Sequence, residues 1–151
     1  MTSRADESDV TTNLLATMHE GGHGLYDQGL SPGDRDRFLG DGPSMGMHEA
    51  QARLWENHVG RSLAFSQFLF PQMRNLFAGA LDGISAESFW RSLNRVRPSA
   101  NRIGADEMSY HLHIILRTEV ETALVSDQLS VGDLPQAWNE RSLALLGTKP
   151  S

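Results

Sequence analysis

The sequence is organised around the stretch Thr17-Met18-His19-Glu20-Gly21-Gly22-His23-Gly24-Leu25, which contains the pattern His-Glu-x-x-His. If this stretch is helical, His19 and His23 lie one turn apart on the same face, where both imidazoles can reach one ion. Glu20 follows the first histidine, so its carboxylate can take a proton from a water at the ion's open position. This combination is typical of zinc peptidases. The alternative is a chance match, in which two polar histidines lie on the surface of an amphipathic helix.

The residues on either side of the motif predict that it lies on a helix. Ser8 or Asp9 can cap the start, the helix runs to about Gln28, and Gly29 followed by Pro32 stops it. Between these ends, apolar residues recur at helical spacing, namely Leu14, Leu15, Met18, Leu25 and Tyr26. The two histidines are therefore expected on a helix that has an apolar side to pack against the rest of the chain.

Three glycines interrupt this predicted helix, at positions 21, 22 and 24. Each costs roughly 1 kcal/mol in helix propensity relative to alanine. We therefore expect another segment to approach the backbone closely here. A metal site packed against a second helix would account for the glycines, and so would plain contact between two helices.

The composition limits the possible classes of protein. With 151 residues, 39% of them hydrophobic and 21% charged, the sequence is typical of one soluble globular domain spanning residues 1–151. The net charge of −6 argues against a nucleic-acid-binding surface, which needs clustered Lys and Arg. Because cysteine is absent, a metal site must use His, Asp or Glu, and the absence fits a reducing cytoplasm.

No segment of the sequence is predicted to enter a membrane. The N-terminal stretch Met1–Asp9 is polar and acidic and lacks the apolar core of a secretion signal. The longest mostly apolar window, Leu63–Phe70, is too short to span a bilayer. We therefore expect a soluble, cytoplasmic protein.

Helical spacing dominates the rest of the chain. Residues 31–46 combine glycines, a proline and charges and predict a loop, long enough to be functional. Helices are predicted from Ser44–Met47 to about Phe70, where Pro71 interrupts; over 72–81; from Ser85 to before Arg97; from about Asp106 to Ser126; and from the cap Asp133 to Gly147. No alternating strand pattern of any length is present, so the predicted fold class is mainly α.

A zinc ion needs a third protein ligand, and Glu49 is the candidate. It lies in a second His-Glu pair, near the start of the helix that follows the predicted loop. A carboxylate from the next helix is a suitable third ligand for two histidines one turn apart. The alternative is a solvated glutamate near a helix start, where a negative charge suits the helix dipole anyway. For a single glutamate considered alone, the sequence favours that alternative.

Three further residues are candidates for contacts with a substrate. His48 is a candidate for hydrogen bonding to substrate or for orienting a carboxylate, and Gln51 for contacting a peptide backbone. The fork of Arg102 suits a carboxylate such as the free C-terminus of a peptide. Spacing alone favours a surface arginine paired with Asp106 or with nothing. The remaining histidines read as core or surface residues and not as ligands, namely His58, His111 and His113.

Four segments carry a family resemblance when they are taken in order. The first is His19-Glu20-Gly21-Gly22-His23-Gly24-Leu25-Tyr26-Asp27-Gln28-Gly29, and the second is Met47-His48-Glu49-Ala50-Gln51-Ala52-Arg53-Leu54-Trp55-Glu56-Asn57 with Val59-Gly60-Arg61-Ser62. The third is Asn101-Arg102-Ile103-Gly104-Ala105-Asp106-Glu107, followed by Tyr110 and by Leu112-His113-Ile114-Ile115-Leu116-Arg117. The fourth is Asp133-Leu134-Pro135-Gln136-Ala137-Trp138-Asn139-Glu140. Together they resemble the carboxypeptidase Taq family over nearly the whole chain.

The resemblance implies a fold, an activity and a site. The family consists of zinc-dependent metallocarboxypeptidases with a largely helical, gluzincin-like fold, which are cytoplasmic, often homodimeric and broad in specificity. It implies that Glu20 is the general base and that the substrate cleft contains His48, Gln51 and Arg102. It also implies that the metal ligands are His19, His23 and Glu49. Zinc is the usual metal, and cobalt supports activity in some members.

The sequence departs from the family pattern in two ways. Ala50 stands in His48-Glu49-Ala50-Gln51 where the family has serine or glycine, a small change that should spare the ligand. Family members are also much longer, and their upstream His-Pro-Phe and downstream Gln-Asp-x-His-Trp motifs are absent here. The upstream Asp-x-Arg-x-Thr element survives at most as Thr2 near Arg4. The chain therefore resembles the central catalytic segment, a truncated helical zinc-peptidase core.

Two functional hypotheses follow from the sequence. The first is a metallocarboxypeptidase, or its catalytic core, which releases C-terminal amino acids from peptide substrates. The second is a truncated relative that binds zinc or a partner protein without cleaving anything. A shortened helical fold would expose apolar surface, so a homodimer or another association through that surface is expected.

Overall fold

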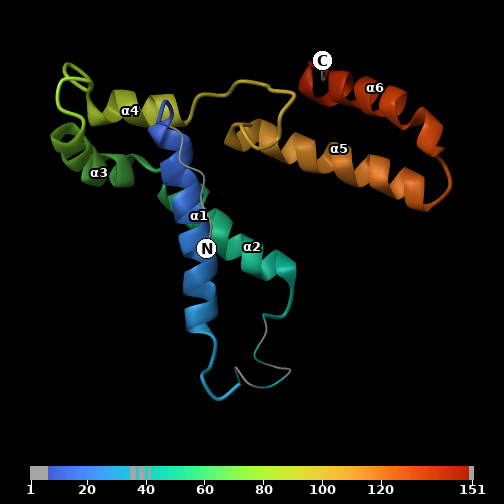
Figure 1. Cartoon of the computed structure of the whole chain (residues 1–151), viewed down its shortest axis with the longest axis horizontal. Coiled ribbons are helices and arrows are strands. Elements are labelled where there is room, and N and C mark those ends of the chain that lie inside the picture. The colour runs from blue at the N-terminus through green and yellow to red at the C-terminus, as the bar shows by residue number, and fades with distance from the viewer. Residues whose placement is uncertain (1–6, 35–36, 38–39, 41, 150–151) are drawn as a thin grey trace. The chain divides into compact units, whose positions relative to one another are not determined.

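The computed structural model describes residues 7–34, 37, 40 and 42–149, and within these ranges the chain is helical with no strand (Figure 1). This confirms the mainly α prediction. The elements are α1 (Val10–Gly29), α2 (Met45–Arg53), the π-helix η2 (Leu54–Val59), α3 (Leu63–Leu76), α4 (Ala86–Leu93), α5 (Glu107–Val125), the 3-10 helix η3 (Val131–Asp133) and α6 (Leu134–Leu146). Thr2 and Arg4 lie outside the described residues. No described helix is both long enough and apolar enough to cross a membrane.

The chain divides into two compact units, residues 1–93 and 94–151. The first unit contains α1 to α4 together with η2, and the second contains α5, η3 and α6. Each unit has its own cluster of buried apolar side chains. The expectation of one domain over the whole chain stays a prediction.

Helix α1 begins where Asp9 caps it. The Asp9 carboxylate accepts backbone N–H bonds from Thr11 and Thr12 at 3.0 and 3.1 Å. The hydroxyls of the same two threonines also donate to it, both at 2.6 Å. Hydrogen bonds from Thr11 and Thr12 lower the pKa of the Asp9 carboxyl to about 2, because they stabilise its charged form. Of the two caps that the sequence offered, Asp9 is the one used.

Helix α1 packs against α2 and η2 (Figure 1), and two glycines allow the approach. A Cβ on Gly22 would lie 2.6 Å from Ala52 Cα and 2.8 Å from the Gln51 carbonyl oxygen. A Cβ on Gly60, directly after η2, would lie 2.9 Å from Met18 Sδ. The close approach predicted from the glycine run is therefore found, and it is a helix–helix contact at Gly22.

The predicted helix from residues 44–47 to Phe70 is wrong in its middle and at its end. Helix α2 passes into a π-helical turn after Arg53, and a new helix, α3, begins after Ser62, whose hydroxyl accepts the N–H of Phe65 at 3.1 Å. Pro71 lies inside α3 and does not end it. An interior proline costs about 3 kcal/mol in a helix. Phe70 and Met73, on either side of it, are each only 4% exposed in one core, and their burial offsets that cost.

The segment after α3 also differs from the prediction of a short helix over 72–81. Its first residues belong to the last turns of α3, and the residues after Leu76 form turns. Gly79 and Gly83 adopt φ values of 86° and 76°, which a helix does not contain. The glycines of this stretch therefore end one helix and separate it from α4.

The core of the first unit lies where α3 and α4 meet the N-terminal half of α1. Its buried members are Leu15, Phe70, Met73, Phe89 and Leu93. Two hydrogen bonds connect α4 to the segment after η2. Trp90 Nε1 donates to the Arg61 carbonyl at 3.0 Å, and the Arg61 guanidinium donates to the Leu93 carbonyl. These contacts anchor the α1 and η2 segments that carry the site.

In the second unit, α5 and α6 pack side by side around Leu116, Val120 and Leu146 (Figure 1). His113 is a core histidine, as predicted, because it is 2% exposed and its Nε2 hydrogen-bonds the Ser99 carbonyl at 2.9 Å. Gly147 ends α6 with a φ of 68°, as predicted. The Asp133 side chain does not cap α6. It accepts the Ser130 hydroxyl at 2.7 Å instead, within the η3 turn.

Candidate metal centre

Helices α1 and α2 bring three potential ligand atoms together. His19 and His23 lie one turn apart on α1, and their Nε2 atoms are 3.2 Å apart. Glu49 on α2 places Oε2 3.6 Å from His19 Nε2 and 3.4 Å from His23 Nε2. Ligand atoms held about 2.0–2.2 Å from one tetrahedral ion lie about 3.3–3.6 Å from each other. The three atoms therefore fit a single divalent ion, and the predicted set is brought together.

A carboxylate holds His19 from behind. Glu56 Oε2 lies 2.8 Å from His19 Nδ1, so a neutral His19 donates its N–H to Glu56 and leaves a lone pair on Nε2. Glu56 is 17% exposed and comes from η2, the π-helical turn. Single π-helical turns occur frequently at functional sites. Glu56 thus selects the tautomer of His19 that can bind a cation.

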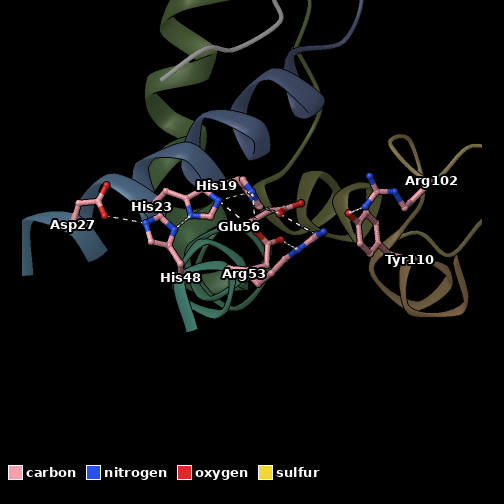
Figure 2. A network of polar contacts seen from close by, with 9 residues as sticks. His19, His23, Asp27, His48, Arg53, Glu56, Arg102 and Tyr110 are labelled. Carbon is pink, nitrogen blue, oxygen red and sulfur yellow. Dashed lines mark hydrogen bonds and ion pairs between the residues drawn. The ribbon is translucent and has the colours of Figure 1, made fainter. Parts of the chain in front are cut away.

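A histidine and a carboxylate hold His23 in a similar way (Figure 2). His48 Nε2 lies 2.9 Å from Asp27 Oδ1, and His48 Nδ1 hydrogen-bonds His23 Nδ1. If His48 donates to the Asp27 carboxylate, its other ring nitrogen accepts the N–H of His23. The Nε2 of His23 then also carries a lone pair. The lone pairs of the two histidine Nε2 atoms and one carboxylate oxygen of Glu49 therefore point to a common position, where they can coordinate a cation.

Arg53 lies beside both carboxylates of the site. Its Nε donates to Glu49 Oε1 at 3.0 Å, and its Nη1 donates to Glu56 Oε2 at 3.1 Å. Three residues of this site were not predicted from the sequence, namely Arg53, Glu56 and Asp27. The spacing of Glu49, Arg53 and Glu56 by four and then three residues, on one helical face, was the signal that could have found two of them.

The predicted base and the predicted cleft residues lie in different surroundings. Glu20 follows His19 on α1 and is partly exposed, and no other described residue engages its carboxylate in a hydrogen bond or ion pair. Gln51 lies on α2, where its backbone carbonyl faces Gly22. His48 lies behind His23, as described above. The roles assigned to these three residues stay predictions.

Arg102 belongs to the second unit, at the turn before α5. Its guanidinium donates to the Tyr110 hydroxyl at 2.8 Å and lies 5.4 Å from the centre of that ring. Arg102 Nε is buried without a hydrogen-bond partner among the residues that the structure describes. The pairing with Asp106 that spacing favoured is not formed. Asp106 caps α5 instead, accepting the N–H groups of Met108 and Ser109 at 2.9 Å.

Comparison with known proteins identifies the family of this chain. The family model described as carboxypeptidase Taq (M32) metallopeptidase matches residues 1–151. The chain belongs to the carboxypeptidase Taq family. Membership in a metallopeptidase family implies a divalent metal ion, and the two imidazoles and one carboxylate of this site suit such an ion.

Curated relatives in the carboxypeptidase Taq family are similar along the whole chain. Thermostable carboxypeptidase 1 of Thermus thermophilus is 45% identical over 150 residues, which are 99% of this chain and 29% of the relative. Carboxypeptidase 1 of Bacillus subtilis is 39% identical over 150 residues, 99% of this chain and 30% of the relative. The chain thus spans about 30% of the length of the curated relatives that it matches.

Solved structures of carboxypeptidase Taq family members share the fold. The M32 carboxypeptidase from Deinococcus radiodurans R1 superposes with a TM-score of 0.96 at 42% identity, covering 99% of this chain and 30% of that one. Trypanosoma cruzi metallocarboxypeptidase 1 gives a TM-score of 0.87 at 34% identity, covering 98% of this chain and 30% of that one. These matches confirm the predicted resemblance and its restriction to part of the longer relatives.

Proposed function

We propose that His19, His23 and Glu49 bind one zinc ion, and that this centre serves a metallocarboxypeptidase that releases C-terminal amino acids from peptides. The observation that carries the proposal is the convergence of the three ligand atoms at 3.2–3.6 Å from one another. The family and its relatives, which are named carboxypeptidases, support the reaction class. Cobalt suits the same two imidazoles and carboxylate and is the second choice of metal.

Glu20 is the proposed general base. The ion, when bound, polarises the scissile carbonyl and makes a water more acidic. The Glu20 carboxylate accepts the proton of the attacking water and later passes a proton to the leaving amine nitrogen. Its position next to a ligand and its freedom from other described partners leave it available for this role.

Recognition of the substrate is assigned to three residues. The Arg102 guanidinium binds the free C-terminal carboxylate, which restricts cleavage to the last residue. Tyr110 supports this role because its hydroxyl accepts a hydrogen bond from Arg102 Nη1 and so holds the guanidinium in place. Gln51 contacts the peptide. The resemblance assigns His48 the same role, and its hydrogen bonds to His23 and Asp27 also suit it to position His23. We assign the protein to the cytoplasm and, following the resemblance, expect a homodimer.

A second candidate function is metal or partner binding without catalysis. Two observations favour it. Large apolar side chains are exposed on both units, including Met45 at 81%, Leu76 at 79% and Val125 at 80%. An open groove of about 620 Å³ in the second unit is lined by apolar residues such as Val120, Leu134 and Trp138, and it contains no predicted site residue.

One experiment separates the two functions. We measure zinc content and hydrolysis of an N-blocked dipeptide for the wild-type chain and for Glu20→Gln, with Glu87→Gln as an exposed-carboxylate control from the same unit. A peptidase holds one zinc per chain in all three proteins and loses about 10²–10⁴-fold of its hydrolysis rate only in Glu20→Gln. Bound zinc without hydrolysis in any variant supports metal binding without catalysis. Absence of zinc from the wild type contradicts the metal centre, and with it the peptidase, and leaves partner binding as the function.

A further inference from the structure

Arg53 contacts one of the proposed ligands and the carboxylate that supports another. Its Nε donates to Glu49 Oε1 at 3.0 Å and its Nη1 to Glu56 Oε2 at 3.1 Å. Glu56 Oε2 is the same atom that accepts from His19 Nδ1 at 2.8 Å. The Arg53 guanidinium is therefore linked to two of the three proposed ligands. It contacts Glu49 on α2 directly, and it reaches His19 on α1 through Glu56 (Figure 2).

The contact makes the two oxygens of Glu49 unequal. Oε1 is held by Arg53, whereas Oε2 lies 3.6 and 3.4 Å from the two histidine Nε2 atoms. The Glu49 side chain is 45% exposed, so without Arg53 its carboxylate would rotate among several rotamers in solvent. The planar guanidinium presents its N–H groups in a fixed fork, which suits the holding of two carboxylates at a set separation.

We propose that Arg53 is a positioning residue of the metal centre. It holds Glu49 by Oε1, so that Oε2 alone is presented to the ion, and it holds Glu56 against His19. This proposal rests on the metal centre proposed above. It adds that the affinity for the ion depends on a residue that does not touch the ion.

A plain helical ion pair is the competing explanation, and the chain contains one for comparison. Glu87 and Arg91 on α4 have the same four-residue spacing, with Nη2 and Oε1 2.8 Å apart. Their side chains are 58% and 71% exposed and make no further ion pair in the described part of the chain. Arg53 is 24% exposed and has two carboxylate partners. Arg91 is therefore a matched control that shares the pairing but has no link to the site.

The test compares Arg53→Met, Arg53→Lys and Arg91→Met with the wild-type chain. Zinc affinity is measured by competition with a chromophoric chelator, and the melting temperature of the metal-free protein is measured in parallel. We expect Arg53→Met to bind zinc about 10–100-fold more weakly, the range for loss of a residue that orients a metal ligand. Arg91→Met should keep wild-type affinity, and both methionine variants should have similar metal-free melting temperatures.

The lysine variant shows whether zinc affinity depends on the two-pronged hydrogen bonding of the guanidinium or only on its positive charge. A single ammonium cannot reproduce the two N–H bonds of Arg53, so Arg53→Lys should also bind zinc clearly more weakly than the wild type. The visible absorption spectrum of the cobalt-loaded protein should change in both Arg53 variants and not in Arg91→Met, because the geometry of Glu49 changes. Wild-type affinity in Arg53→Met, or full rescue by lysine, would overturn the positioning role and leave the metal centre intact. If the wild-type chain binds no zinc, the proposed metal centre is contradicted, and the positioning role of Arg53 is contradicted with it.

Discussion

Glu56 on the π-helical turn η2 accepts a hydrogen bond from His19 Nδ1 on α1, with the two atoms 2.8 Å apart. The bond fixes the orientation of the imidazole and leaves Nε2 as the atom that faces His23 and Glu49. Much of the affinity of this centre for a cation is therefore expected to depend on residues that do not touch the cation.

Glu56→Ala should weaken binding of zinc about 10–100-fold, because His19 loses its orienting acceptor and Arg53 loses one of its carboxylates. Glu56→Gln keeps a carbonyl acceptor for the His19 N–H and should fall between the alanine variant and the wild type. Calorimetric titration with zinc checks both. Glu119→Ala, which removes an exposed carboxylate paired with Arg141 in the second unit, is the control. Equal affinities in the wild type and Glu56→Ala would contradict the role given to Glu56.

The contact between α1 and α2 predicts opposite effects at two adjacent glycines. A Cβ at position 22 would meet Ala52 Cα at 2.6 Å, so Gly22→Ala must push the helices apart and should lower the free energy of unfolding by about 1–3 kcal/mol. A Cβ at position 21 would have no atom of the described residues within 4 Å, apart from its own helix backbone and chain neighbours. Gly21→Ala should therefore raise the free energy of unfolding by up to about 1 kcal/mol through helix propensity. Urea unfolding of both variants checks the pair.

The same two glycine variants also test whether zinc affinity depends on the close packing of α1 against α2. The separation of α1 from α2 moves Glu49 away from the two histidines, so Gly22→Ala should bind zinc more weakly while Gly21→Ala keeps wild-type affinity. If Gly22→Ala unfolds at the same urea concentration as the wild type, the close approach is not a constraint on this fold.

Much of the site could be predicted because its central part is local in sequence. The interval between His19 and His23 is one helical turn, and the cap at Asp9 and the stop after Gly29 fixed the helix that carries them. Glu49 was a candidate from the second His-Glu pair, but the family resemblance was needed to prefer a ligand over a solvated glutamate. Nothing in a single helix shows which carboxylate of the next helix faces it. Asp27 and Glu56 were missed because their partners lie on another segment, His48 on α2 and His19 on α1.

The wrong helix boundary has a similar cause. Pro71 is an interruption signal in the sequence, and the burial of Phe70 and Met73 that outweighs it is a tertiary effect. The π-helical turn η2 is not marked by any residue preference that a sequence analysis can use. It nevertheless supplies Glu56, so the part of the site that depended on this turn could not be predicted.

Asp9 predicts a pH dependence of stability in the acid range. Its pKa in the folded chain is about 2, lowered from the model-compound value of 3.8 by the hydrogen bonds from Thr11 and Thr12. Because the folded pKa is lowered, the stabilisation is present above about pH 4 and is lost as pH falls towards 2. Asp9→Asn keeps a capping acceptor but cannot titrate, so the difference in urea midpoint between wild type and variant should shrink over this window.

The control for this prediction removes the cap itself. Asp9→Ala should cost about 0.5–2 kcal/mol near neutral pH, which is the usual loss for a helix N-cap. A difference between wild type and Asp9→Asn that stays constant from pH 5 to pH 2 would show that the Asp9 charge is not coupled to folding.

His48 has two possible roles, positioning of His23 or contact with the peptide, and the two predict different effects of substitution. The family resemblance implies that His48 lies in the substrate cleft, whereas its Nδ1 hydrogen-bonds His23 and its Nε2 lies 2.9 Å from Asp27. If His48 positions His23, His48→Ala and Asp27→Ala should both weaken zinc binding, by about 10-fold or more. If His48 contacts only the peptide, His48→Ala should raise KM for an N-blocked dipeptide at saturating zinc, and Asp27→Ala should leave zinc affinity unchanged. Chelator competition and steady-state kinetics on the same preparations distinguish the two, and the hydrogen bonds to His23 and Asp27 favour the first.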